Sequence, residues 1–300
     1  MIAGRDRAMR WLKNGMTPGL LGLVMMWCLG GLGVDSAAGY VLPGPFVLEQ
    51  MAHNLAGSST LRVTQKVTVE DPTVSTEPLI LDETLSYIFP DQFRSEMVYQ
   101  NSQRIHVSSH EQALTIVDGK ITADPDGRFE RYKDLLLHNS ARLLTRTLVE
   151  NGVDVGVTSL GRSGDQIVYV IGAQYPDDSV SQVWVDQDQF LPLRWLTVRQ
   201  IPGSADPGDR WEFVYGAWQK VDGVFYPFHI ETYHNGQLIR SIRVSMVDAN
   251  AVIDQKNMSI AHLRSIYQEA QPPALPESRP DTGADGVQRT VEDFGKKIEP

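Results

Sequence analysis

The spacing of apolar residues changes along the chain from a helical period to a strand period. Over residues 46–57 apolar groups recur at helical spacing, and Gly57 stands where a helix C-terminus often carries glycine. Over residues 60–70 the period becomes two, as in a half-buried antiparallel strand, and residues 83–98 read as strand, Pro-Asp turn and strand. The pattern therefore predicts one amphipathic helix followed by antiparallel strands.

More strands are predicted after these. Residues 104–117 form two short strands, and a tight turn at Asp118-Gly119 precedes another at 120–122. Further turns are predicted at 161–164, 186–189, Asp222-Gly223 and Asn235-Gly236. Because consecutive hairpins usually pair with their neighbours, we expect a meander of about ten or eleven strands in chain order. The fold class is mainly β (α+β).

A helical segment interrupts this meander at residues 129–152. Ser140 is placed to cap its second part, and Asn151-Gly152 to end it. Its apolar stripe predicts a lid that packs on the sheet through Tyr132, Leu135, Leu136, Leu143, Leu144 and Leu148.

A large twisted sheet curls, and its concave face is the only apolar surface on which these helices can bury their stripes. Roughly 30 helical residues would have to cover about ten strands, which predicts an apolar cavity suited to an apolar ligand. The alternative is that the inward aromatic residues simply fill the core. The predicted lining residues are Leu61, Val63, Val67, Leu85, Tyr87, Phe89, Phe93, Met97, Trp184, Leu193, Trp195, Trp211, Phe213, Tyr215, Phe228, Ile230, Ile242 and Val244.

The N-terminus has the features of a cleaved signal peptide. Four basic residues between positions 5 and 13 precede an uncharged apolar run at 19–34, and small residues at Ser36 and Ala38 predict cleavage after Ala38. A retained anchor is one alternative, and lipidation of Cys28 is another, although the bulky Trp27 beside it argues against lipidation. We expect export to the periplasm.

Cleavage would change both the cysteine content and the charge. Cys28 is the only cysteine, so the cleaved chain would have no disulfide and no thiolate. The net charge is −10 for the whole chain and −12 without residues 1–38, which argues against nucleic acid and against electrostatic docking on anionic lipid. We expect a half-barrel domain over 39–268 and a proline-rich disordered tail over 269–300, in which 287–298 has helical spacing.

These features together resemble the LolA/LolB-like superfamily of outer-membrane lipoprotein-sorting proteins. The resemblance rests on the signal peptide, the first helix, "LRVTQKVTVEDP", "LSYIFPDQFRSEMV", the helical insertion and "VWVDQDQFLPLRWLTV", and it covers residues 45–258. It implies an unclosed antiparallel half-barrel with a helical lid over an apolar cavity. It also implies a periplasmic carrier for acyl chains of lipoproteins or lipids, which it hands to a partner at the inner or outer membrane.

Motifs for catalysis do not emerge from the sequence. His106 and His110 flank a predicted turn, His229 and His234 fall on opposite faces of a strand, and neither HExxH nor GxSxG is present. "DPDG" at Asp124 is read as a surface turn. We therefore expect a monomeric protein that is not an enzyme and binds no metal or cofactor. The alternative is an RseB-like regulatory module that senses lipid or mislocalised envelope components; a hydrolase is a third, weaker hypothesis.

Overall fold

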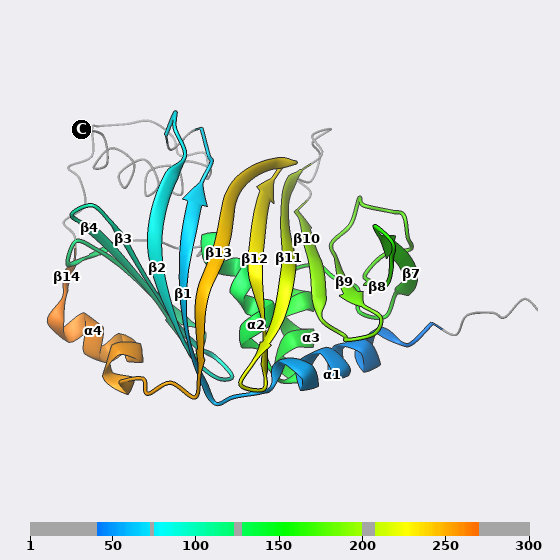
Figure 1. Cartoon of the computed structure of the whole chain (residues 1–300), viewed down its shortest axis with the longest axis horizontal. Coiled ribbons are helices and arrows are strands. Elements are labelled where there is room, and N and C mark those ends of the chain that lie inside the picture. The colour runs from blue at the N-terminus through cyan, green and yellow to red at the C-terminus, as the bar shows by residue number, and fades with distance from the viewer. Residues whose placement is uncertain (1–40, 73–74, 123–127, 200–207, 270–300) are drawn as a thin grey trace, which may run out of the picture. The chain divides into compact units, whose positions relative to one another are not determined.

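A computed structural model describes residues 41–72, 75–122, 128–199 and 208–269. The predicted signal peptide with Cys28 and Ala38, the DPDG turn and the tail beyond residue 269 lie outside the described residues. The described chain forms a single sheet with helices on both of its faces (Figure 1). This sheet is unclosed and almost wholly antiparallel, as predicted.

The elements of the first half run from the centre of the sheet to one edge. Helix α1 precedes β1, and β2 to β6 follow as successive hairpins. Their bounds are α1 Gly44–Leu55, β1 Thr60–Val69, β2 Leu79–Ile88, β3 Gln92–Tyr99, β4 Ser102–Ser109, β5 Gln112–Val117 and β6 Lys120–Thr122.

The helical insertion leads to the other edge, and the strands of the second half return to the centre. Its elements are η1 Arg128–Lys133, α2 Asp134–Leu137 and α3 Ala141–Glu150. The strands after it are β7 Thr158–Ser163, β8 Gln166–Ile171, β9 Gln182–Asp186, β10 Pro192–Arg199, β11 Asp209–Val221, β12 Val224–His234 and β13 Gln237–Ala249. The chain continues as η2 Gln255–Met258, α4 Ile260–Ile266 and the short β14 Gln268–Glu269, which pairs in parallel with β6.

The order of strands corrects the predicted meander. The sheet reads β14-β6-β5-β4-β3-β2-β1-β13-β12-β11-β10-β9-β8-β7, so β1 pairs with β13 at its centre and β6 and β7 stand near opposite edges. Within the described residues it has fourteen strands, where ten or eleven were predicted. Because residues 123–157 must connect two distant edges, the helical insertion has to cross a face of the sheet. The topology itself therefore places the lid.

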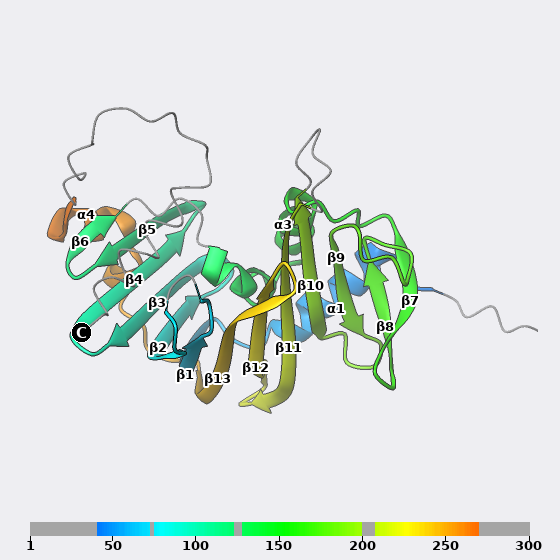
Figure 2. The same cartoon turned by 90° about the horizontal axis from the view of Figure 1, so that it is seen from above.

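Helices α1, α2 and α3 lie on the inner side of the curved sheet (Figure 2). Val47, Leu48 and Met51 of α1 are fully buried there, together with the apolar residues of α2 and α3. Helix α4 instead packs on the outer face, where Ile260 and Leu263 join a small cluster of residues from β4, β5 and β6. The main core therefore lies between the concave face and the lid.

Candidate functional site

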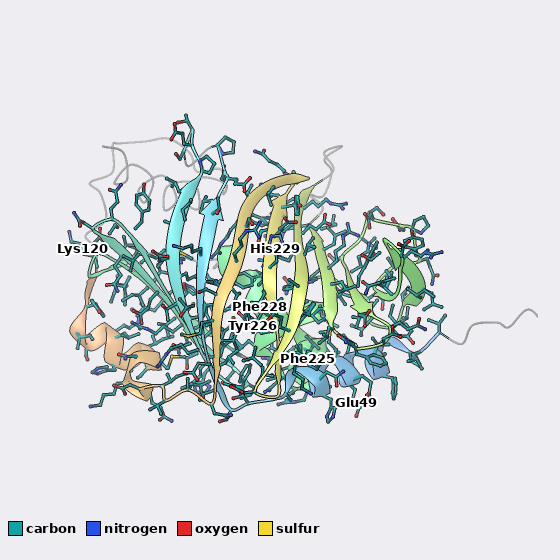
Figure 3. The ribbon with its side chains drawn as sticks, in the orientation of Figure 1. Glu49, Lys120, Phe225, Tyr226, Phe228 and His229 are labelled. Atoms are coloured by element: carbon teal, nitrogen blue, oxygen red, sulfur yellow. The ribbon has the colours of Figure 1, made fainter. Side chains whose placement is uncertain are left out.

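The concave face brings together most of the predicted lining residues. Two of them, Phe89 and Phe228, are only partly buried against the core. Tyr226 and Phe228 lie in the first half of β12, the strand that contacts α1 (Figure 3). The others in the same buried cluster are Leu61, Val63, Val67, Leu85, Tyr87, Phe93, Met97, Trp195, Trp211, Phe213, Tyr215, Ile230, Ile242 and Val244.

Trp184 and Leu193 were wrongly predicted to line the hollow. Trp184 pairs with Arg194, while their neighbours Val183 and Trp195 pair on the concave side. Leu193 is the extra residue of an irregularity between Pro192 and Arg194, and such a bulge reverses the alternation of side chains. Both residues pack instead with Val168, Val170 and Ala173 in a separate cluster. This cluster, with the Arg194 guanidinium 4.6 Å from the Trp184 ring, covers the outer side of the hairpin.

The lid buries its predicted stripe against this face. Tyr132, Leu135, Leu144 and Leu148 are fully buried, Leu136 is nearly so, and Leu143 is only half-buried. Ser140 caps α3, as predicted, because its side chain accepts a hydrogen bond from the backbone N–H of Leu143. The lid thus meets the sheet mainly through non-directional apolar contacts, which another apolar surface could replace.

A polar cluster, which the sequence reading missed, lies within this apolar face. The Glu83 carboxylate accepts hydrogen bonds from Arg240 Nη2 at 3.0 Å, Gln65 Nε2 at 2.6 Å and Ser95 Oγ at 2.5 Å. The side chains of Glu83 and Arg240 are 0% and 1% exposed. Gln65 Nε2 also contacts the Tyr132 hydroxyl, at 3.2 Å, so the cluster touches the lid. The sequence does contain a signal for this cluster. Gln65 on β1, Glu83 on β2 and Arg240 on β13 each occupy an inward position among apolar residues.

The concave face becomes polar towards β4 and β5. Arg104 donates a hydrogen bond to Glu130 of η1 at 2.5 Å, and His106 contacts the Thr115 hydroxyl at 2.9 Å. Burial raises the pKa of the Glu130 carboxyl, but the positive charges of Arg104, His106 and Arg240 outweigh it and hold that pKa well below its usual range. Glu130 is therefore a buried carboxylate, and the apolar part of the face ends near β3.

Three tyrosines add neutral polar groups to the apolar part. The hydroxyls of Tyr87 and Tyr226 are 3.0 Å apart, and Tyr215 donates to the backbone oxygen of Tyr132 at 2.8 Å. Burial raises the pKa of all three phenols well above the usual value, so they remain protonated and can donate. The Tyr215 hydroxyl orients the lid, whereas those of Tyr87 and Tyr226 bond to each other on the sheet.

A small cavity opens at one end of the concave face. It measures about 190 Å³ and is bounded by Trp211 and Thr197 of the sheet, Arg131 of η1 and the C-terminal end of α3. A larger hollow of about 620 Å³ lies elsewhere, between α4 and the turns that join β2 to β3 and β4 to β5. Most of the concave-face residues named above are buried in the same core as the leucines of the lid, so a ligand that contacts them has to displace part of the lid.

Within residues 41–269, apart from the gaps, no three His, Cys, Asp or Glu side chains gather as metal ligands would. In that same part of the chain, helices of the length and apolarity needed to cross a membrane are absent.

The architecture is the unclosed half-barrel with a helical lid that the resemblance to the LolA/LolB-like superfamily implies. No family model and no curated protein sequence matches the chain.

Solved structures give distant similarities. An outer membrane lipoprotein-sorting protein domain from Vibrio parahaemolyticus is 11% identical, with a TM-score of 0.48 over 73% of this chain and 97% of that one. A DUF1329 family protein from Desulfovibrio piger is 12% identical, with a TM-score of 0.47 over 74% and 98%. A LolA superfamily protein from Nitrosomonas europaea is 10% identical, with a TM-score of 0.43 over 74% and 99%. The function of this chain has to be argued from its own residues.

Proposed function

We propose that this protein is a periplasmic carrier that binds the acyl chains of lipoproteins or other lipids between its sheet and its lid. The observation that carries the proposal is the largely apolar concave face, which runs from β8 to β3 and is interrupted by the polar cluster around Glu83. Among the described residues it is covered by α1 and by the lid of η1, α2 and α3. Its location follows from the signal-peptide pattern of residues 1–38. The proposed role as a carrier follows from the resemblance of the sequence pattern to the LolA/LolB-like superfamily.

Binding would exchange one apolar contact for another. The leucines of α2 and α3 bury their side chains on the sheet, and an acyl chain can take their place if the displaced leucines pack on the bound chain. The net gain is then about 25 cal/mol per Å² of apolar surface of the acyl chain removed from water. No charge on the protein is needed for this. Release would return the lid to the sheet and pass the chain to a partner at the inner or outer membrane.

Mass spectrometry tests the proposal. The protein is purified without detergent, extracted with organic solvent, and the extract is analysed for lipids. We expect an acyl-bearing lipid in stoichiometric amount, and saturable uptake of a fluorescent fatty acid that unlabelled fatty acid displaces. Protein that is repeatedly lipid-free and takes up no fatty acid would contradict the proposal.

Two neighbouring residues of β13 provide a matched pair of variants. Ile242 is buried on the concave face, whereas Ser241 lies on the outer face. Ile242→Thr should lower fatty-acid affinity several-fold because it places a hydroxyl among the apolar groups, and Ser241→Thr should leave it unchanged. Equal affinities in both variants, with melting curves that show folded protein, would locate binding elsewhere.

The RseB-like regulatory role stays a prediction. Deletion of residues 271–300 would separate the two roles. A regulatory contact through the tail predicts that lipid uptake survives this deletion while the cellular phenotype is lost.

A further inference from the structure

The hollow of about 620 Å³ between α4 and the turns β2–β3 and β4–β5 has an apolar wall. That wall is formed on one side by the β2–β3 turn and on the other by η2 and the first residues of α4. Concave sites with apolar walls and a few polar groups at the rim are typical of binding sites. The apolar lining residues are Ile88, Phe89, Pro90, Met258, Ile260 and Ala261.

The rim of this hollow is polar and carries a carboxylate. Asp91 contacts the Nδ1 atom of His110 at 2.9 Å, and Gln92 contacts the Nε2 atom of the same ring at 3.2 Å. The other polar residues among those that line the hollow are uncharged glutamines and serines. A segment that fits the hollow should therefore combine apolar side chains with a cation at their edge.

The chain itself contains such a segment, at residues 287–298, outside the described residues. Val287, Val291, Phe294 and Ile298 recur at i, i+4, i+7 and i+11, which is the spacing of one helix face. At about 100° per residue, Lys297 lies at the edge of this apolar stripe. A helix of only 12 residues is marginal in water, so the stripe needs an apolar surface to be stable.

The hollow lies within easy reach of this segment. Ile260 and Ala261 line the hollow at the start of α4, and the described chain ends at Glu269. Helix α4 is about 10 Å long, and the three residues after it add roughly 10 Å, so Glu269 lies within about 20 Å of the hollow. The 17 residues 270–286 have a root-mean-square span of about 23 Å if they behave as a flexible chain. A linker is most effective when its span matches the distance to be bridged, as it does here.

We propose that residues 287–298 bind in this hollow as a helix, with the apolar stripe against the β2–β3 turn and α4 and with Lys297 beside Asp91. The inference goes beyond the carrier function and does not depend on it. The hollow adjoins the concave face through Phe89, whose ring stacks on that of Tyr87 with the centroids 5.8 Å apart. The bound segment would thus lie next to the rim of the concave face.

Limited digestion of the full-length chain with trypsin tests the proposal. The bond between Arg289 and Thr290 lies inside the segment, and mass spectrometry measures its cleavage from the peptides that begin at Thr290. A tethered segment has an effective concentration of about 1 mM, so one with a Kd of about 0.1 mM is bound about ten times as often as it is free. We expect this bond to be cut about tenfold more slowly than in a variant that cannot dock.

Two such variants have matched controls. Ala261→Trp fills the hollow from an exposed position of α4, and Phe294→Ser removes the largest side chain of the stripe. Each should accelerate cleavage about tenfold, with the melting temperature of the folded domain unchanged. Ser265→Trp, on the same helix but outside the hollow, should leave the rate unchanged. Asp293→Ser, off the stripe, should stay within about twofold of wild type, because it alters only charge pairs along the helix.

Three results would overturn the proposal. Wild-type cleavage as fast as that of Phe294→Ser would mean that the stripe docks nowhere. Acceleration by Phe294→Ser without acceleration by Ala261→Trp would place the segment on another surface. Protection that disappears on dilution would mean that a second copy of the chain supplies the surface.

Discussion

Arg240 on β13 reaches across β1 to bind Glu83 on β2, with its Nη2 atom 3.0 Å from the carboxylate oxygen. The pair thus joins the two halves of the sheet where β1 and β13 meet. Removal of one partner leaves the other charge buried, so we expect Arg240→Met to lower the free energy of unfolding by about 3–5 kcal/mol.

The double variant Glu83→Leu/Arg240→Met should recover much of this loss, as chemical denaturation would show. Lys66→Met is a matched control, because the adjacent pair between Lys66 and Asp82 is exposed, at 63% and 74%. It should change the free energy of unfolding by less than about 1 kcal/mol. A double variant as unstable as the single one would mean that Gln65 and Ser95 require the carboxylate.

The hydrogen bond from Tyr215 to the backbone oxygen of Tyr132 holds the lid to the sheet. Tyr215→Phe removes it with little change of volume, and one such bond contributes about 1 kcal/mol. If the lid must move for loading, the rate of fatty-acid uptake in stopped-flow fluorescence should rise about fivefold.

A suitable control for that variant is Trp218→Phe. It removes a comparable bond to a backbone oxygen, that of Pro192, from a residue paired with Pro227 in the same sheet. Its uptake rate should remain that of wild type. Equal acceleration in both variants would indicate general loosening rather than movement of the lid.

Glu130 should contribute to stability in a pH-dependent way. Its pKa is lower in the folded chain than in the unfolded chain, so its contribution is present above the unfolded pKa and is lost as pH falls through the folded pKa. Glu130→Gln should therefore lower the free energy of unfolding by about 3 kcal/mol at pH 7. The difference from wild type should narrow below about pH 4.5, as denaturant titrations at several pH values would show. A difference independent of pH would contradict the role of its charge.

His138, between α2 and α3, predicts a change at milder acidity. Burial lowers the pKa of its imidazole, with Lys133 and Arg146 adding to the effect and Asp134 opposing it. Because the folded chain disfavours protonation, this contribution to stability is complete above the unfolded pKa of about 6.5 and is lost as pH falls through the lower folded value.

The free energy of unfolding should consequently decrease between pH 7.5 and 5.5, and His138→Asn should flatten the dependence. Glu130 stays ionised over this interval and cannot account for such a slope. Identical slopes in wild type and variant would exclude His138 as its source.

The resemblance to the LolA/LolB-like superfamily implied the unclosed half-barrel. Alternation of apolar residues predicted its antiparallel strands and most of the side chains that share one face. It failed at Leu193, because the alternation assumes an unbroken register and the bulge before Arg194 cannot be read from residue types alone. It also failed for the order of strands. Local periodicity contains no information on the pairing of β1 with β13, which are far apart in the chain.

The polar cluster was missed for a different reason. Gln65, Glu83 and Arg240 each interrupt an otherwise apolar series of inward positions, and each alone reads as an imperfection of the pattern. Their common role depends on β1, β2 and β13 being neighbours. Once that order is known, three polar residues at inward positions of adjacent strands predict a buried network.

The chain runs from β6 through the lid to β7, so the lid is connected to the sheet at both of its ends, near opposite edges. A lid attached at one end can rotate away from the sheet, whereas a lid attached at both ends can only move outward at its middle. Ligands would then enter laterally between the lid and the sheet. The cross-section of the largest ligand that fits would depend on the length of the connections at the two ends of the lid. Shortening residues 151–157, which join α3 to β7, should exclude lipids with several acyl chains before those with one.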